Sequence, residues 1–447
     1  MNTDTVMRWI SIACGCGLLV AAGAVTADFN YFPGNQIKHK VRWIQAVVTD
    51  ITTPPTVTNL PGGGPRFQTH QPGKMQPGLT LIVSVGEDSL NTPKVVDAEG
   101  NIIHQWRTDW FEIWPDDSGF AEKKRPKRQP GVSVHGIKIT EDGGIVFNFE
   151  ILSTVRIDAC SNVQWKLNNR GHHFVTEDEN GDFWVGGGML HPRGTEFRHP
   201  NFRMPLAEDT ILQLSPEGEV KREIPILDIL FQNDLHGLIF MGTLQQIDTR
   251  VGGDTIHLND VEFFPSDMEE GIFKHGDMIM SLRNNHSIIV VDPETLEIKH
   301  RATGMFMRQH DPDFISGDKY IVFDNQTMRY GEGQGESRSR IVEVTASPDG
   351  GVKEWREVYA PANDEAKFYT RAMGWQQPLD NGNVLAVVSF DGRIVELDSE
   401  GKLVWEYRNA VGENVRGLVS EGERLPVEMD ADWFAQKRAA AGCATTN

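Results

Sequence analysis

Residues 308–325 read RQHDPDFISGDKYIVFDN. His310 stands just before a short apolar strand, a Gly-Asp turn follows, and a second strand returns as YIVFDN. The same layout recurs earlier in the chain, behind His135, behind the adjacent His172 and His173, and behind His257. Histidine thus returns at one place in a repeating hairpin, and in a closed ring of such units these side chains would converge.

A second hairpin follows most of these units, with acidic and glycine residues at its turn and often a tryptophan at its end. Six copies lie at 95–106, 156–165, 213–222, 290–299, 343–355 and 396–405. Two antiparallel hairpins make a four-stranded blade, and a ring of such blades is a β-propeller. We therefore predict an all-β fold, a six-bladed β-propeller of four-stranded antiparallel blades.

The first predicted blade, around residues 79–106, lacks an inner strand. The segment RGLVS, which begins at Arg416 after the sixth blade, can supply it. A ring closed by the chain's own end leaves no exposed sheet edge, so we expect a C-terminal strand to complete the first blade. Long loops interrupt the repeat, and residues 226–247 are predicted to be helical because their leucines recur at helical spacing.

The composition limits the class of partner. The chain of 447 residues carries 43 Lys and Arg against 63 Asp and Glu, which gives a net charge of −20. Nucleic acid is therefore not expected as a partner, because phosphate binding requires a basic surface. A hydrophobic fraction of 39% is that of a globular protein, long enough for one large domain or two ordinary ones.

The N-terminus has the pattern of an export signal. Arg8 precedes an apolar run from Trp9 to Val25, and the small residues VTA stand at 25–27. Residues 1–27 are predicted to be either a cleaved signal peptide or an uncleaved membrane anchor, and both place the rest of the chain in the periplasm or elsewhere outside the cytoplasm. The remaining predicted parts are a Pro/Gly-rich arm at 28–77, the propeller at 78–430, and a polar, frayed tail at 431–447.

Four cysteines are present, of which Cys14 and Cys16 fall in the apolar run. Cys160 and Cys443 remain, and they could pair in an oxidising compartment, which the sequence leaves open. The sequence contains no Cys-x-x-Cys or other zinc pattern.

The innermost strand of a propeller blade lines the central channel, so the recurring histidines face one rim of that channel. Arg371 holds roughly the same place in the sixth unit, and Arg283 follows the second strand of the His257 unit. Arginine offers a fixed fork for sulfate, phosphate or carboxylate oxygens, and neutral imidazole is a nucleophile and a general base. These residue types together predict an anion site at the mouth of the channel.

Each of these residues also has a simpler interpretation. A single histidine at the start of a strand usually caps the strand or contacts solvent, and only the recurrence favours a site. His310 and Asp311 could instead form a metal pair, while Asp311 and Asp313 could orient His310 or tie turns. We predict no metal at the site.

Four motifs follow one another along the chain: HH at 172–173 before an acidic glycine turn, HLNDVE at 257–262 with SLR at 281–283, QHDPDF at 309–314 with VFDN at 322–325, and LVWEYRN at 403–409. Their order resembles the arylsulfotransferase family of bacterial exported proteins, over roughly residues 79–430. The resemblance implies a six-bladed propeller that moves a sulfuryl group from an aryl sulfate donor to a phenolic acceptor through a transiently sulfated histidine.

By this resemblance the nucleophile is His310, because the family carries it in the His-led motif before VFDN. The resemblance further implies that His257 and Arg283 hold sulfuryl oxygens, as does one of His172 and His173. His135 and Arg371, which share the repeat position, are expected to help bind the substrate. No metal or nucleotide cofactor is implied, because the aryl sulfate is itself the activated donor.

The chain also departs from the best-known sulfotransferases of this family. Those carry a separate β-rich domain before the propeller, where this chain has about 50 residues rich in Pro and Gly. Two alternatives therefore stay open: another enzyme on the same site, such as a sulfate-ester hydrolase or a lyase, and a non-catalytic propeller that binds an anion or a partner protein. The fold alone does not choose among them.

Overall fold

The computed structural model describes residues 57–58, 65–86, 91–129, 131–199, 202–240, 251–327, 338–412 and 415–443. The chain divides into two compact units, Met1–Val57 and Thr58–Asn447, and the second contains the blades. The predicted signal or anchor and the first part of the predicted arm lie outside the described residues. In the described part of the chain, no helix has the length and apolarity needed to cross a membrane.

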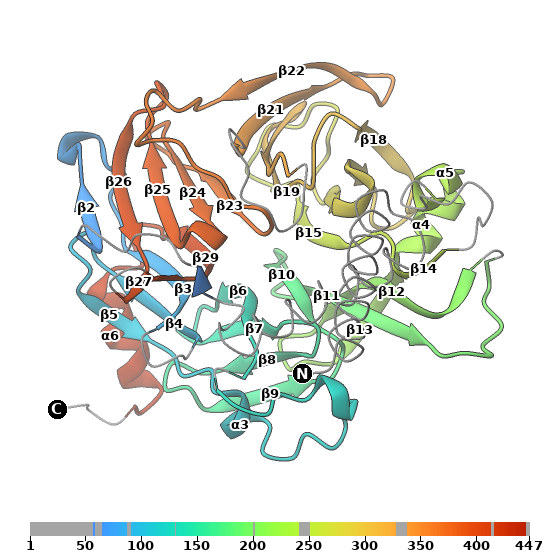
Figure 1. Ribbon diagram of the computed structural model, residues 1–447, viewed down its shortest axis with the longest axis horizontal. Helices are drawn as coiled ribbons and strands as arrows, with labels where there is room; N and C mark the ends of the chain where they lie inside the picture. Colours follow the sequence, from blue (N-terminus) through green and yellow to red (C-terminus); the bar gives the residue numbers. More distant parts are fainter. Residues whose placement is uncertain are drawn as a thin grey trace, which may run out of the picture. The chain divides into compact units, whose positions relative to one another are not determined.

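The second unit is a ring of six antiparallel blades, and the predicted fold is confirmed (Figure 1). From the channel outward, blade 1 is β29 (Val419–Arg424), β3 (Thr80–Val85), β4 (Asn91–Val96) and β5 (Ile102–Gln105), and blade 2 is β6 (Val134–Ile139), β7 (Ile145–Phe149), β8 (Ser153–Ile157) and β9 (Val163–Leu167). Blade 3 is β10 (His172–Glu177), β11 (Phe183–His191), β12 (Phe202–Leu214) and β13 (Val220–Pro225), with β14 (Val251–Asp254) parallel to β12.

Blade 4 is β15 (Leu258–Phe263), β16 (Met278–Leu282), β17 (Ser287–Val291) and β18 (Ile298–Thr303), and blade 5 is β19 (His310–Ser316), β20 (Lys319–Asp324), β21 (Arg340–Ala346) and β22 (Val352–Val358). Blade 6 is β23 (Trp375–Pro378), β24 (Val384–Val388), β25 (Arg393–Leu397) and β26 (Leu403–Arg408), with β2 (Phe67–Thr69) outermost. The hairpin of β27 (Ala410–Gly412) and β28 (Val415–Gly417) stands apart from the blades.

The middle strands are continuous apolar runs because each blade packs against a neighbour on both faces. β17 reads SIIVV and β24 reads VLAVV, and every residue of both strands is buried. The inner strand β15 instead reads LNDVEF and places polar residues among apolar ones. The outer strand β22 reads VKEWREV, and its central residues are exposed. The polar residues of the chain that matter for chemistry are therefore concentrated on the inner strands.

The C-terminal strand closes the ring, as the sequence predicts. β29 pairs antiparallel with β3 and becomes the innermost strand of blade 1. It begins at Val419, three residues after the start of the predicted segment at Arg416. Val419 and Val83 are both fully buried in this pairing, so the end of the chain is part of the core.

The described end of the predicted arm lies on the outer edge of blade 6. β2 pairs antiparallel with β26, and Phe67 lies opposite Tyr407. The short 3₁₀ helix η1 (Pro72–Lys74) follows, and Lys74 Nζ is 2.8 Å from Asp398. A strand that covers the outer edge of a blade removes an unpaired row of backbone groups.

The predicted helical segment at 226–247 is two short helices where it is described, and residues 241–250 lie outside the described residues. The helices are α4 (Ile226–Gln232) and α5 (His236–Phe240). Their apolar residues pack in one core cluster with the long strand β12 of blade 3. A further short helix, α3 (Trp110–Ile113), lies in the loop between blades 1 and 2.

The prediction of a frayed tail is wrong for residues 431–443. Helix α6 (Ala431–Ala440) begins after Asp430, whose side chain accepts a hydrogen bond from the backbone N–H of Trp433. Phe434 is 1% exposed and stacks against His104 of blade 1. The N-cap residue Asp430, followed by Trp433 and Phe434, is a sequence pattern that favours a docked helix. The small residues at the end of the chain suggested a loose tail instead.

A disulfide joins Cys443, just after α6, to Cys160 in the turn between β8 and β9. We expect the double variant Cys160→Ser/Cys443→Ser to melt several degrees lower, because a cross-link of this kind typically contributes about 2–4 kcal/mol. Thermal melting followed by circular dichroism measures the shift. A reductant should lower the wild-type melting temperature to that of the variant and leave the variant unchanged; a wild-type protein insensitive to reductant would contradict the expectation.

Candidate functional site

A local irregularity turns side chains toward the channel at the start of the inner strands. Five of the six inner strands shift register within their first residues, and β23 alone among the described inner strands pairs regularly from its start. His173 and Asp311 have positive φ angles of 57° and 54° within these bulges, and His257 has a φ of 57° just before β15. A β-bulge re-aims the side chains around it, and its recurrence explains why the repeat histidines meet.

Four of the predicted histidines form one group. His172 Nδ1 is 2.9 Å from His173 Nδ1, and His173 Nε2 is 3.1 Å from His257 Nε2. The ring centroids of His135 and His173 are 4.5 Å apart. We call His135, His172, His173 and His257 the histidine group. The structure therefore brings together residues from three consecutive blades that the sequence connects only through the repeat.

Carboxylates hold two members of the histidine group in place. His257 Nδ1 lies 2.6 Å from Asp254 Oδ2, and His135 Nδ1 lies 2.8 Å from Glu150 Oε2. Burial opposes ionisation of Asp254, yet its hydrogen bond with His257 and the charge of that ring lower the pKa of Asp254 below its usual value. The Asp254 carboxylate therefore accepts a hydrogen bond from His257 Nδ1–H. Neither carboxylate carries a recognisable sequence motif, and only the folded chain reveals them.

The predicted nucleophile His310 is held as one defined tautomer. Asn325 Nδ2 donates to the carbonyl oxygens of Thr370 and Met373, at 3.1 and 2.6 Å, so its Oδ1 faces the imidazole. That oxygen is 2.7 Å from His310 Nδ1, which is also 3.0 Å from the Arg308 carbonyl oxygen. Both partners accept, so Nδ1 carries the proton and Nε2 carries a lone pair.

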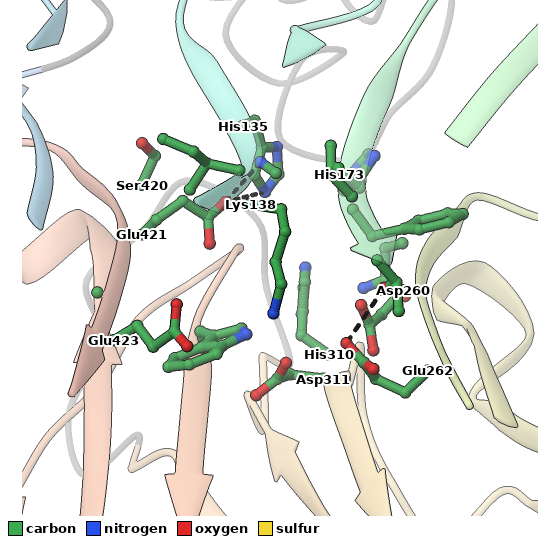
Figure 2. A pocket seen from close by; sticks show the side chains of 18 of the residues that line it. His135, Lys138, His173, Asp260, Glu262, His310, Asp311, Ser420, Glu421 and Glu423 are labelled. Carbon is green, nitrogen blue, oxygen red and sulfur yellow. Dashed lines mark hydrogen bonds and ion pairs between the residues drawn. The ribbon is translucent and has the colours of Figure 1, made fainter. Parts of the chain in front are cut away.

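The lone pair of His310 points into a cavity. The side chain is 3% exposed, and Nε2 has no hydrogen-bond partner among the described residues. Figure 2 shows the ring directed toward the end of the cavity where His135 and His173 lie. Burial lowers the pKa of His310 well below its usual value, and the charge of Arg283 lowers it further. His310 is therefore a neutral imidazole at neutral pH, which is the nucleophilic form.

The two predicted arginines have different surroundings. Arg283 begins the 3₁₀ helix η3 (Arg283–Asn285) directly after β16, and its charge acts on the pKa of His135, His173 and His310. Its charge therefore acts on three of the predicted histidines, and its expected contact with sulfuryl oxygens stays a prediction. Arg371 instead stacks its guanidinium over the Phe390 ring, 4.3 Å from the centroid. Neither arginine is among the residues that line the cavity containing His310, nor are His172 and His257.

His310 and Asp311, which the sequence offered as a possible metal pair, have separate hydrogen-bond partners. Asp311 accepts a hydrogen bond of 2.5 Å from the backbone N–H of Gln376 in blade 6, while His310 is held by Asn325. Asp313 accepts from the side chain of Gln376 at 2.7 Å. The two aspartates therefore tie blade 5 to blade 6, a role that differs from orienting His310 or tying turns.

The cavity, of about 130 Å³, has two chemically different ends (Figure 2). His135 and His173 lie at one end, with Glu421 beside His135, and the other carboxylates lie toward the opposite end, with Lys138 reaching between the two ends. The carboxylates that line it are Asp260, Glu262, Asp311, Glu421 and Glu423. This acidic end was not predicted from the sequence. Asp260 and Glu262, at alternate positions in the HLNDVE motif, were a visible sign of it. An anion is favoured only at the histidine end.

Burial raises the pKa of several carboxyl groups in and around the cavity. It raises the pKa of Glu262 and of Glu421 to about 7, and it raises the pKa of Asp260, Asp311 and Asp313 well above the usual value, with neighbouring carboxylates adding to the effect for the aspartates.

We expect Glu262→Gln to stabilise the protein at pH 8 and to change little at pH 4. The pKa of Glu262 rises from 4.5 in the unfolded chain to about 7 in the folded chain. The protonated side chain is therefore compatible with folding at low pH, and the free energy of unfolding falls as the pH rises from about 4.5 to about 7. The neutral amide avoids the cost, which reaches roughly 3 kcal/mol above pH 7. Denaturant unfolding at both pH values measures the difference. The exposed variant Glu122→Gln serves as control, and a gain for Glu262→Gln that is equal at both pH values would contradict the expectation.

Comparison with known proteins gives one family match. The family described as Arylsulfotransferase (ASST) matches residues 136–410. No curated protein matches the chain. Solved structures that are similar include a protein of unknown function from Bacteroides caccae (12% identity, 77% of this chain and 98% of that chain, TM-score 0.47). They also include virginiamycin B lyase from Staphylococcus aureus (11% identity, 78% of this chain and 90% of that chain, TM-score 0.38).

Proposed function

The chain belongs to the arylsulfotransferase (ASST) family, and from that premise we propose that it transfers a sulfuryl group from an aryl sulfate to a phenolic acceptor through a covalent intermediate on His310. The observation that carries the proposal is the lone pair of His310 Nε2, which is buried and without a hydrogen-bond partner in the described part of the chain. The proton of the same ring is fixed on Nδ1 by Asn325.

In the first step His310 Nε2 attacks the sulfur of the donor. The N–S bond forms, the bond between sulfur and the aryl oxygen breaks, and the electron pair leaves with the phenol oxygen. The ring then bears substituents on both nitrogens and becomes positively charged. Asn325 Oδ1, 2.7 Å from Nδ1, accepts a stronger hydrogen bond from the charged ring. In the second step the oxygen of the acceptor phenol attacks the same sulfur, the N–S bond breaks, and neutral His310 is restored. The acceptor phenol releases its proton to solvent, which balances the proton that the first phenolate takes up.

The residues around His310 stabilise the charge that develops. Arg283 and the histidine group supply donors to the sulfuryl oxygens, and preorganised donors of this kind act most strongly in a buried site. His257, whose Nδ1 is anchored by Asp254, faces His173 with its Nε2 and so helps to hold that ring in place beside His310. His135 and His173 line the cavity with His310 and are suited to receive the sulfate group.

Steady-state kinetics test the reaction class. With 4-nitrophenyl sulfate as donor and phenol as acceptor, we expect ping-pong behaviour, that is, parallel double-reciprocal lines as the acceptor concentration changes. Sustained nitrophenol release without acceptor, with inorganic sulfate as the product, would contradict sulfuryl transfer and support the hydrolase alternative. Inertness toward a panel of aryl sulfates, with saturable binding of an anion, would support the non-catalytic alternative.

The proposal includes export. Residues 1–27 carry the signal or anchor pattern, and the disulfide between Cys160 and Cys443 is the kind of bond that persists in an oxidising compartment. Fractionation of cells that produce the full chain tests it: activity in the periplasmic or membrane fraction is expected, and activity confined to the cytosolic fraction would contradict it.

A further inference from the structure

His135, Glu150 and His173 come from separate strands and converge on one point. Each can direct one donor atom toward it, and these atoms lie within 4.8 Å of one another. His135 Nδ1 is 2.8 Å from Glu150 Oε2, and His173 Nδ1 is 4.0 Å from Glu150 Oε1. Donor atoms around a tetrahedral zinc ion with bonds of about 2.0–2.1 Å lie about 3.3 Å apart. These two separations lie on either side of that value, and no pair of the three donor atoms is more than 4.8 Å apart, so side-chain shifts of about 1–1.5 Å would complete the arrangement.

The hydrogen-bond count of the histidine group requires one positive charge among His172, His173 and His257, which an added proton or a bound metal ion can supply. His172, His173 and His257 form a row between two groups that only accept, the Gly187 carbonyl, 3.0 Å from His172 Nε2, and the Asp254 carboxylate, 2.6 Å from His257 Nδ1. Each end requires one N–H, and each of the two contacts between rings requires one more. Four protons are therefore needed on three rings, whereas three neutral imidazoles carry three.

A metal ion on His173 Nδ1 removes this mismatch. His173 then donates from Nε2 to His257, and His257 donates from Nδ1 to Asp254, so both rings are neutral. His172 then needs only its Nε2 proton, which it donates to the Gly187 carbonyl, and no fourth proton is required in the row. Such outer partners, which fix the tautomer and orientation of ligand histidines, are a regular feature of metal sites.

We propose that His135, Glu150 and His173 bind a divalent transition-metal ion of the zinc class. Two imidazoles and one carboxylate suit this class, whereas calcium and magnesium prefer oxygen ligands throughout. Three protein ligands leave a coordination position for water or an anion. Two of the three ligands, His135 and His173, also line the cavity that contains His310, so the site borders that cavity. The site stands on geometry and does not depend on sulfuryl transfer.

Two charges near the site act in opposite directions. Glu421 Oε1 lies 4.0 Å from His135 Nε2, the outer nitrogen of that ligand, and its carboxylate favours a cation. Arg283 stands beside the histidines and disfavours one. The charge of Glu150 itself decides the balance, so the affinity is expected to depend mostly on that residue.

Metal titration of the full chain tests the site. The protein, prepared without a polyhistidine tag and stripped with EDTA, is titrated with Zn²⁺ in a calorimeter and with Co²⁺ by visible absorption. We expect one equivalent to bind, and we expect Glu150→Gln, which keeps the size of the side chain, to weaken binding by at least about 100-fold. His135→Ala should do the same, and His275→Ala, which changes an exposed histidine in blade 4, should bind as the wild-type protein does.

Absence of saturable binding by the wild-type protein would overturn the proposal, as would unchanged binding by a folded Glu150→Gln variant. Circular dichroism melting establishes that each variant is folded. No aryl sulfate is present in these titrations, and sulfation of His310 is measured separately on the EDTA-stripped protein. Failure of the metal site and failure of sulfuryl transfer are thus distinguished.

Discussion

Replacing His310 with alanine is expected to lower the rate of sulfuryl transfer by at least about 10⁴-fold, the scale of loss when a catalytic nucleophile is removed. No other imidazole in the described part of the chain combines a fixed Nδ1 proton with an unpartnered Nε2 in this cavity. Release of 4-nitrophenol from 4-nitrophenyl sulfate, with phenol as acceptor, measures the loss.

The controls separate chemistry from folding. His310→Gln keeps a polar side chain of similar length and should be as inactive as His310→Ala, with a melting temperature close to that of the wild-type protein. His275→Ala should keep full activity, because His275 is an exposed residue of blade 4. A His310→Ala variant that is folded and retains more than a few per cent of the wild-type rate would show that the nucleophile lies elsewhere.

Replacing Asn325 with leucine is expected to lower kcat by about 10²–10⁴-fold, because loss of a tautomer-fixing partner has effects of this size. Without Asn325 Oδ1 the His310 proton is held by the Arg308 carbonyl alone, and the positive charge of the sulfated ring loses its closest acceptor. KM for the aryl sulfate should change little, since Asn325 contacts the histidine and not the cavity. Initial rates over a range of donor concentrations measure both constants.

A neighbouring variant provides the matched control for Asn325→Leu. Thr327→Val removes another buried hydrogen bond of the same segment, from Thr327 Oγ1 to the Arg371 carbonyl, without touching His310. It should cost about 1 kcal/mol of stability and leave kcat close to the wild-type value. Equal losses of kcat in the two variants would mean that Asn325 acts only through local stability.

In the proposed reaction, the two ends of the cavity would set the direction in which a donor binds. The sulfate group of a donor carries a negative charge, which the carboxylates of Glu262 and Glu423 at one end would repel. His135 and His173 lie at the other end, toward which the His310 ring is directed. This arrangement would direct the sulfur of the donor toward His310.

The repeat made much of this fold and site predictable. The histidine-led inner hairpin and the outer hairpin with its glycine turn specify the blades, and the missing strand near 79–106 indicated closure by β29. The convergence of His135, His172, His173 and His257 follows from their shared repeat position in neighbouring blades.

Other features depend on contacts between distant parts of the chain that no local sequence pattern predicts. Glu150 and Asp254 meet histidines only after the blades are stacked, and Arg371 stacks on Phe390 although its repeat position is similar to that of the histidines. The docking of α6 depends on the burial of Phe434 against blade 1, in a segment whose composition is that of a loose tail.

The most direct test of the account is the covalent state of His310. The purified chain is mixed with 4-nitrophenyl sulfate and no acceptor, and its intact mass and peptide map are recorded. The account predicts one added sulfuryl group on the peptide that contains His310, its removal by phenol, and its absence in His310→Ala. Release of nitrophenol while the His310 peptide stays unmodified, or a sulfuryl group on a different residue that phenol removes, would contradict it.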